Sequence, residues 1–193
     1  MGAYGAITQK IIKRLLAFSS INHIGFILLG MMSYKLMSEG TLFFYLIIYL
    51  ITTFGIFAVI LNLRTVDGEV TKISDLNGLR FTSRPKAIAL LVFLFSLAGI
   101  PPFAGFFAKF FILSASVNEG LYLLSIIAVI SSVIAAFYYL SVIKNMFFND
   151  SKTELLLDNN KISTVVFIVS ALFVTLFFFY PDPLIDLVDI LFS

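Results

Sequence analysis

Long apolar segments alternate with short polar ones along the chain. Each apolar segment has about 20 residues or more, the length of a helix that crosses a bilayer, and none shows the alternation over about 10 residues that is typical of membrane strands. The pattern predicts an all-α polytopic transmembrane helix bundle of about five spans. The expected spans are residues 15–37, 41–63, 87–116, 121–143 and 162–180.

The two ends of the chain are expected to differ from the spans. Residues 1–14 are too short to cross a bilayer and are interpreted as the tail of a helix followed by a basic turn. Residues 181–193 place Asp182, Asp186 and Asp189 on one helical side and apolar residues on the other. This amphipathic tail is expected to lie at the membrane interface.

The third apolar segment is interrupted by Gly99-Ile100-Pro101-Pro102. Because proline lacks a backbone donor and ends or kinks a helix, residues 87–116 are predicted to form two half-helices joined at residues 99–102. The carbonyl groups that the prolines free need water, side chains or neighbouring helices as partners, as in a hydrated path. A proline kink can also be a plain packing feature, so the break alone does not establish a functional site.

Lys109 lies in the second half of this interrupted segment. A lysine near the bilayer centre costs about 2.5–3.5 kcal/mol on insertion scales, and ionisable residues at that depth usually serve a function. Gly105, Lys109 and Ser116 share one helical face among phenylalanines, so the lysine is expected to point inward. Since burial disfavours its charged form, Lys109 is a candidate proton carrier. The alternative is a lysine that snorkels to the nearby interface.

Other polar side chains recur at helical spacing in the remaining spans. Ser19 and His23 are four residues apart and share a face that should point at protein. Two further polar stripes are Tyr45 and Tyr49 with Thr52 or Thr53, and Ser125 with Ser132 and Tyr139. The stripes are candidates for a proton path, but hydrogen bonding between packed helices would give the same pattern. His23 could likewise be a buried histidine bonded to a serine.

Composition supports a membrane protein and excludes several kinds of site. The chain is 60% hydrophobic and 12% charged, with a mean hydropathy of +1.05. It has no cysteine and one histidine, which excludes disulfides, thiolate iron–sulfur ligation and a bis-His haem from this chain alone. The first apolar segment is too long for a signal peptide and is interpreted as a retained span. The many phenylalanines would suit an AT-rich organellar genome.

The basic residues indicate the orientation. With five spans, all thirteen Lys and Arg except Lys35 and Lys109 fall on one side of the membrane. The positive-inside rule places that side, with the N-terminus, in the cytoplasm or matrix and the acidic tail outside.

Three stretches resemble a known family. GAITQKIIKRLLAFSSINHIGFILLG (residues 5–30) and SLAGIPPFAGFFAKFFIL (residues 96–113) resemble the antiporter-like subunits of respiratory complex I, the proton-pumping NADH:ubiquinone oxidoreductase. GIPP followed by lysine is similar to the subunit 2 branch of that family, and DLNGLRFTSRPKAIAL (residues 75–90) lies between the two motifs as in that branch.

The resemblance implies roles for particular residues. Lys109 matches the lysine of the discontinuous helix, the exit-side proton carrier, and Gly99, Pro101 and Pro102 match its break. His23 matches a histidine of the first motif. No cofactor is expected in this chain, because FMN, iron–sulfur clusters and ubiquinone belong to partner subunits of such a complex. Family members also have an N-terminal half with its own broken helix, which this sequence does not contain.

We therefore expect the C-terminal half of a split subunit in the mitochondrial inner membrane, with the N-terminus in the matrix. Its expected partners are a separately encoded N-terminal half, neighbouring antiporter-like and small membrane subunits, and lipid, but no nucleic acid. The alternatives are a subunit of a cation/proton antiporter or membrane-bound hydrogenase, and a structural spacer for assembly without pumping.

Overall fold

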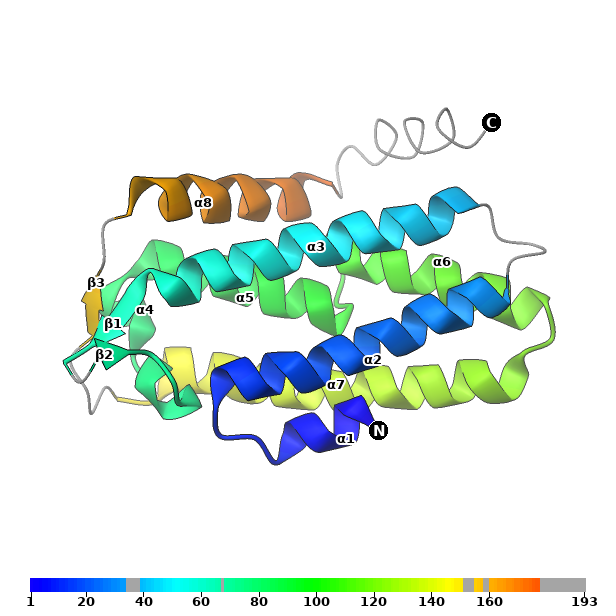
Figure 1. Ribbon diagram of the computed structural model, residues 1–193, viewed down its shortest axis with the longest axis horizontal. Helices are drawn as coiled ribbons and strands as arrows, with labels where there is room; N and C mark the ends of the chain where they lie inside the picture. The colour runs from blue at the N-terminus through cyan, green and yellow to red at the C-terminus, as the bar shows by residue number, and fades with distance from the viewer. Residues whose placement is uncertain (34–38, 67, 151–154, 158–159, 178–193) are drawn as a thin grey trace.

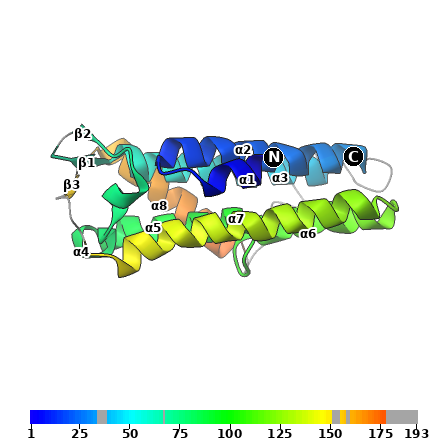
Figure 2. The ribbon, with the colours of Figure 1, turned by 90° about the horizontal axis from the view of Figure 1, so that it is seen from below.

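The computed structural model describes residues 1–33, 39–66, 68–150, 155–157 and 160–177. Its long helices run side by side along one axis, with α2 and α3 in one layer and α5, α6 and α7 in the other (Figures 1 and 2). The helix bundle predicted from the apolar pattern is confirmed. The helices are α1 (Gly2–Ile7), α2 (Ile12–Met32), α3 (Glu39–Leu61), α4 (Leu79–Thr82), α5 (Arg84–Ala98), α6 (Ala104–Asn118), α7 (Tyr122–Phe148), α8 (Lys161–Leu176) and the 3-10 helix η1 (Ile73–Leu76).

Among the described residues, three helices are long and apolar enough to cross a membrane: α2, α3 from Gly40, and α7. The shorter apolar helices α6 and α8 have 15 and 16 residues. The helices α5 and α6 follow one another along the bundle, so that together they run beside α3 over most of its length (Figure 1). Whether each of the five expected segments crosses the bilayer stays a prediction.

The helix bounds differ from the expected spans by a few residues. α2 begins at Ile12 and therefore includes Lys13 and Arg14, which were expected in a basic turn. Long basic side chains can extend along a helix toward water, so they need not end it. α5 begins at Arg84 with Pro85 in its first turn, where a missing N–H costs nothing. α7 continues to Phe148, five residues beyond the expected end at 143.

A small sheet at one end of the bundle was not predicted. Strands β1 (Leu63–Thr65), β2 (Gly68–Glu69) and β3 (Leu155–Leu157) pair antiparallel in the order β2-β1-β3. The expected second span ran to residue 63, but α3 ends at Leu61 and the chain turns into β1. Two or three strand residues are too few to give a periodic signal.

The basic segments meet at this end of the bundle. The N–H of Ile12 donates to Thr71 O (3.0 Å) and the N–H of Ile73 donates to Lys10 O (2.9 Å), which places the turn before α2 beside the long connection. The N–H of Gly78 donates to Asn145 O (3.3 Å) near the end of α7. The positions of Lys35, Lys152 and the acidic tail at 181–193 lie outside the described residues.

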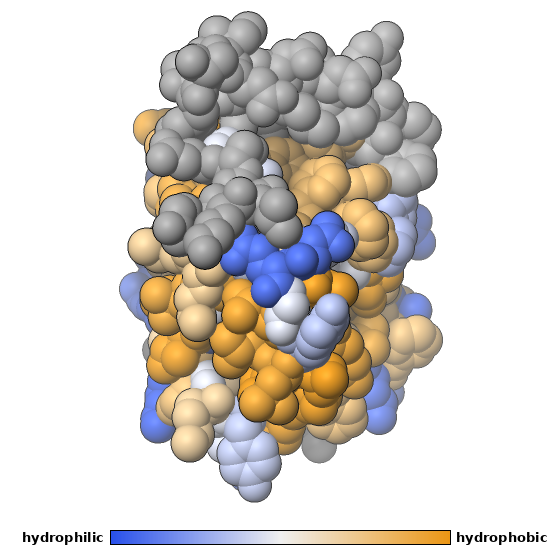
Figure 3. All heavy atoms as spheres, turned by 90° about the vertical axis from the view of Figure 1, so that its right-hand side faces the viewer, coloured by the Kyte–Doolittle hydropathy of each residue, from blue (hydrophilic) through white to orange (hydrophobic). Residues whose placement is uncertain are grey.

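Close packing holds the layers together, while the outside is apolar. A Cβ on Gly55 of α3 would lie 2.3 Å from the ring of Phe93 in α5, so the ring fits there only because residue 55 has no side chain. Leu123, Val133 and Phe137 of α7 are 72%, 66% and 64% exposed, as expected of a surface that faces lipid. Seen from the end at which α6 passes into α7, a small hydrophilic patch has hydrophobic side chains on both sides (Figure 3).

Candidate functional site

The break between α5 and α6 begins with a Schellman turn. Gly99 follows the last residue of α5 with a φ of +83°, a conformation that favours glycine. The N–H of Gly99 donates to Ser96 O (3.0 Å), and the N–H of Ile100 donates to Phe95 O (3.0 Å). This motif satisfies two of the last carbonyl groups of α5 and leaves the following two to other donors.

The start of α6 packs directly on the end of α5. Pro101 and Pro102, joined by a cis peptide bond, lie in the break, and α6 begins at Ala104. The N–H of Gly105 donates to Ser96 Oγ (3.1 Å). A Cβ at Gly105 would lie only 2.0 Å from Ser96 O, so only glycine permits this contact.

Lys109 donates hydrogen bonds to the two remaining carbonyl groups of α5. Its Nζ donates to Leu97 O (2.7 Å), to Ala98 O (3.1 Å) and to Ser132 Oγ of α7 (3.0 Å). The side chain is 5% exposed, and Nζ lies 5.2 Å from the ring centroid of Phe26 in α2. No ion pair with Lys109 occurs within the part of the chain that the structure describes. The lysine is thus held by neutral acceptors and a ring face.

A second buried cluster surrounds His23. Its Nδ1 lies 2.7 Å from the hydroxyl of Tyr45, and its Nε2 lies 3.4 Å from the hydroxyl of Tyr139. The Tyr139 hydroxyl is also hydrogen bonded to Ser19 Oγ. The ring of Tyr49 stacks on His23 with centroids 4.8 Å apart. The cluster therefore joins α2, α3 and α7 through groups that can each donate and accept a proton.

A small cavity lies between the two clusters. Its lining includes His23, Tyr45 and Tyr49 on one side and Ser96 and Lys109 on the other. Its volume is about 10 Å³, which is near the lower limit for one water molecule. The cavity therefore has room for at most one water molecule between residues of the two clusters.

The structure separates the polar stripes that the sequence showed. Ser132 reaches Lys109 and Tyr139 reaches His23, but the hydroxyl of Ser125 pairs with that of Ser116 at 2.7 Å, nearer the end where α6 meets α7. The hydroxyl of Tyr45 contacts His23 Nδ1, whereas the hydroxyl of Tyr49, whose ring stacks on His23, donates to Ser20 Oγ (2.8 Å). The stripe on α7 thus contributes one hydroxyl to the lysine site, one to the His23 cluster and one to the pair with Ser116.

Sequence reasoning missed some residues of the site. Phe26 was not singled out, because a phenylalanine among many apolar residues carries no signal of its own. Ser96 lines the cavity as well and belongs to no recognised stripe, whereas Thr52, which also lines it, continues the stripe of Tyr45 and Tyr49. The need to satisfy freed carbonyl groups was predicted from the prolines, but the sequence did not show that Lys109 itself satisfies them.

The sheet end of the molecule holds exposed charges. Lys13 Nζ lies 2.8 Å from Glu69 Oε2, and Arg64 lies 3.6 Å from Glu69 Oε1. The hydrogen bond and charge of Lys13, with a smaller effect of Arg64, hold the pKa of Glu69 below its usual value. No cluster of His, Cys, Asp and Glu that could hold a metal ion occurs among the described residues.

Comparisons with known proteins agree with this architecture. The family described as "NADH:quinone oxidoreductase/Mrp antiporter, TM" matches residues 1–135. NADH-quinone oxidoreductase subunit N of Rhodospirillum rubrum is 43% identical over 186 residues, which cover 96% of this chain and 38% of that protein. NADH-ubiquinone oxidoreductase chain 2 of Oenothera berteroana is 41% identical over 187 residues, covering 95% of this chain and 38% of that protein.

A solved structure shows the same arrangement of helices. A chain of respiratory complex I from Thermus thermophilus with bound aureothin superposes with a TM-score of 0.84 at 26% identity, over 96% of this chain and 42% of that one. The chain spans 38% of the length of the two curated relatives. Because the family match covers most of the sequence and includes both motifs, the second of which contains the buried lysine, the chain belongs to the NADH:quinone oxidoreductase/Mrp antiporter transmembrane family.

Proposed function

We propose that this chain is the C-terminal part of an antiporter-like membrane-arm subunit of respiratory complex I, in which Lys109 carries protons. The observation that supports this most directly is the position of Lys109 Nζ, 2.7 Å and 3.1 Å from two carbonyl oxygens at the end of a broken helix. The relatives named as NADH-quinone oxidoreductase subunit N support the kind of complex.

The surroundings of Lys109 suit a group that changes its charge. Carbonyl dipoles, the Ser132 hydroxyl and the ring of Phe26 all favour the ammonium form. Burial opposes that form, and no carboxylate among the described residues locks the charge in place. Opposing effects of this kind allow a small change nearby to decide whether the lysine holds its proton.

The order of the polar groups along the bundle supports a route for the proton. The proton reaches Lys109 from the His23 cluster through the cavity between them, where one water would complete the connection. It leaves toward the Ser116–Ser125 hydroxyl pair, because Ser116 follows Lys109 two turns later in α6. Tyr45 and Tyr139 hold His23 in place and are part of this route.

The test is proton pumping by the intact complex that carries Lys109→Met. Methionine keeps most of the apolar length of lysine and removes the proton site, so we expect NADH-driven proton uptake into sealed vesicles to be lost or strongly reduced while the complex remains assembled. Lys144→Met, at an exposed position of α7, is the control and should pump normally. Normal pumping by an assembled Lys109→Met complex would refute the proposed role and favour a structural spacer.

We further propose the location and partners. The chain lies in the mitochondrial inner membrane with its N-terminus on the matrix side. The meeting of the basic segments at one end of the bundle supports this orientation, because cytoplasmic or matrix ends collect Lys and Arg. A separately encoded polypeptide supplies the rest of the subunit, and FMN, iron–sulfur clusters and ubiquinone belong to other subunits.

Isolation of the native complex in mild detergent tests these partners. Mass spectrometry should identify flavin and iron–sulfur subunits together with a hydrophobic chain that is similar to the first part of the relatives. Co-purification with cation-antiporter chains alone would instead assign this chain to the antiporter branch of its family.

A further inference from the structure

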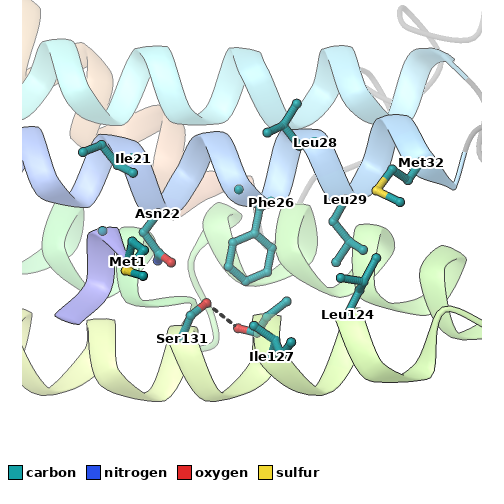
Figure 4. A pocket seen from close by; sticks show the side chains of 13 residues that line it. Met1, Ile21, Asn22, Phe26, Leu28, Leu29, Met32, Leu124, Ile127 and Ser131 are labelled. Carbon is teal, nitrogen blue, oxygen red and sulfur yellow. Dashed lines mark hydrogen bonds between the residues drawn. The ribbon is translucent and has the colours of Figure 1, made fainter. Parts of the chain in front are cut away.

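An open groove runs along α2 and α7 beyond the N-terminal end of α1. Its volume is about 300 Å³, and Met1 lies at the end where α1 stops. Gly25, Leu28 and Met32 of α2 form one side, and Leu124 and Ile127 of α7 form the other. Figure 4 shows Leu29 and Phe26 pointing from α2 toward Ile127 and Leu124, with Met1 at the end of the row.

The groove continues a surface that α1 already covers. A Cβ on Gly2 would lie 2.6 Å from Phe18 O and 2.8 Å from Asn22 N, so α1 rests against the backbone of α2. Phe18, Asn22, Gly25, Leu29 and Met32 follow helical spacing and therefore form one stripe along α2. α1 uses the first part of this stripe, and the groove is the remaining part.

The shape of the groove fits a helix. From residue 21 to residue 32 of α2 the groove is about 17 Å long at the rise of an α-helix, which a helix of about 11 residues would fill. A Cβ on Gly25 would meet no atom of this chain within 4 Å. A glycine with open space along such a stripe lets a second helix backbone approach closely. Leu28, Met32 and Ile127 are 54%, 56% and 54% exposed and would be covered.

Asn22 indicates which polar group the occupant of the groove must provide. Its side chain is 7% exposed and lines the groove, yet its Nδ2 has no hydrogen-bond acceptor within the described residues. A buried amide donor needs an acceptor, and at membrane depth an acyl chain offers none. The occupant therefore presents a side-chain or backbone oxygen near the Met1 end of the groove.

The groove is also the outer wall of the lysine site. Phe26 lines the groove and is 1% exposed. Lys109 Nζ lies over this ring, 5.2 Å from its centroid. Phe26 already separates the lysine from the groove, and a helix in the groove would pack against the outer side of this ring. The occupant would therefore support the side chain that covers the lysine.

We propose that this groove binds one apolar helix of a separate polypeptide that supplies the rest of the subunit, laid end to end with α1 along α2 and α7. The inference rests on the proposed function for the identity of this partner. The continuity with the seat of α1 supports it, as do the unpartnered amide of Asn22 and the coverage of only 38% of the two relatives' length. The occupant excludes lipid from this face and supplies an acceptor to Asn22.

Because the sequence has no cysteine, one introduced cysteine is the only thiol of this chain in a cross-linking test on the intact complex. A cysteine-reactive photo-cross-linker is attached to Ile127→Cys in the groove or to Val133→Cys on the opposite side of α7, which is also exposed. We expect Ile127→Cys, but not Val133→Cys, to join this chain to an apolar helix of a polypeptide similar to the preceding part of the relatives. Peptide mass spectrometry identifies the joined residues.

Filling the groove gives a second measurement. Gly25→Leu places an isobutyl group in the open space beside Gly25, so the product of Ile127→Cys should be lost. A product between two copies of this chain, a product with lipid only, equal yields from both cysteines, or no product would each overturn the inference. None of these outcomes changes the Lys109→Met pumping result, so the two proposals fail separately.

Discussion

Two lysines at different places in this molecule show how surroundings determine what the same side chain can do. Lys13, at the sheet end, forms a 2.8 Å ion pair with Glu69, and both side chains are about half exposed, at 42% and 53%. Lys109, in the bundle, is 5% exposed and bonds to two carbonyl oxygens and one hydroxyl. Both make short contacts, but within the described residues only Lys13 has a carboxylate partner and access to water.

The difference indicates which lysine can change its charge. Water stabilises the charged form of Lys13 whether or not Glu69 is present, so its ion pair contributes little to stability. The charged form of Lys109 depends on a few fixed dipoles and on the helix break that frees them. Changes to the Lys109 surroundings should therefore have large effects, and changes to the Lys13 pair small ones.

The largest effect after loss of Lys109 itself is expected at Gly105. In Gly105→Ala the new methyl group would lie 2.0 Å from Ser96 O, a backbone atom that cannot turn aside. Overpacking of a core typically costs about 1–3 kcal/mol, and a backbone contact places this substitution at or above the upper end. We expect much less assembled complex on a native gel and a lower thermal midpoint of what remains.

A matched substitution tests whether this cost arises from the break. Val117→Ile adds one methyl group to the same helix at a position that is 43% exposed, and it should assemble normally. Equal loss from both substitutions would mean that α6 tolerates no added bulk anywhere and that Gly105 has no special place.

A smaller effect is expected at Ser132, the hydroxyl partner of Lys109. Ser132→Ala removes one hydrogen bond to the ammonium, and bonds to charged groups contribute about 1.5–3 kcal/mol. Because the two carbonyl partners remain, we expect reduced proton pumping per NADH in sealed vesicles with normal assembly, a milder defect than in Lys109→Met. Thr175→Ala removes a hydroxyl that bonds only within α8, to Ala171 O, and should pump normally. An unchanged Ser132→Ala complex would show that the carbonyl groups alone hold the lysine.

Much of this site could be predicted from the sequence because membrane depth makes polar residues conspicuous. A lysine and a Gly-Ile-Pro-Pro break within one apolar segment are rare enough to stand out, and both lie at the centre of the site. The helical spacing of Ser19 and His23 correctly indicated a shared inward face, since both are buried and contact Tyr139.

The remainder depended on contacts between distant segments, which periodicity does not contain. Ser125, Ser132 and Tyr139 look alike at intervals of seven, yet they meet three different partners, because Ser116 and Lys109 lie two turns apart on α6 and His23 lies on α2. The sheet was missed for a related reason. Its strands have two or three residues each, and β1 pairs with β3 across about 90 residues of chain, a separation that local pattern does not bridge.

The smallest effect is expected for Glu69→Gln at the sheet end. Lys13 holds the pKa of Glu69 below its ordinary value of 4.5 when the chain is folded, so the pair stabilises the folded sheet end above that pH. The stabilisation is lost as the pH falls through the lowered pKa, where the carboxylate takes up a proton. Wild type and Glu69→Gln should therefore differ slightly in amide hydrogen exchange over residues 62–76 at neutral pH and converge in acid.

Salt provides the check that separates this pair from the buried lysine. Exposed charges are screened at high ionic strength, so the difference between wild type and Glu69→Gln should shrink as salt is added at neutral pH. The pumping defect of Lys109→Met should not respond, because salt does not reach the interior of the bundle. A Glu69→Gln effect that persists in acid and in high salt would mean that Glu69 stabilises the β1–β2 turn through packing. The difference between the two lysines could then not be explained by charge alone.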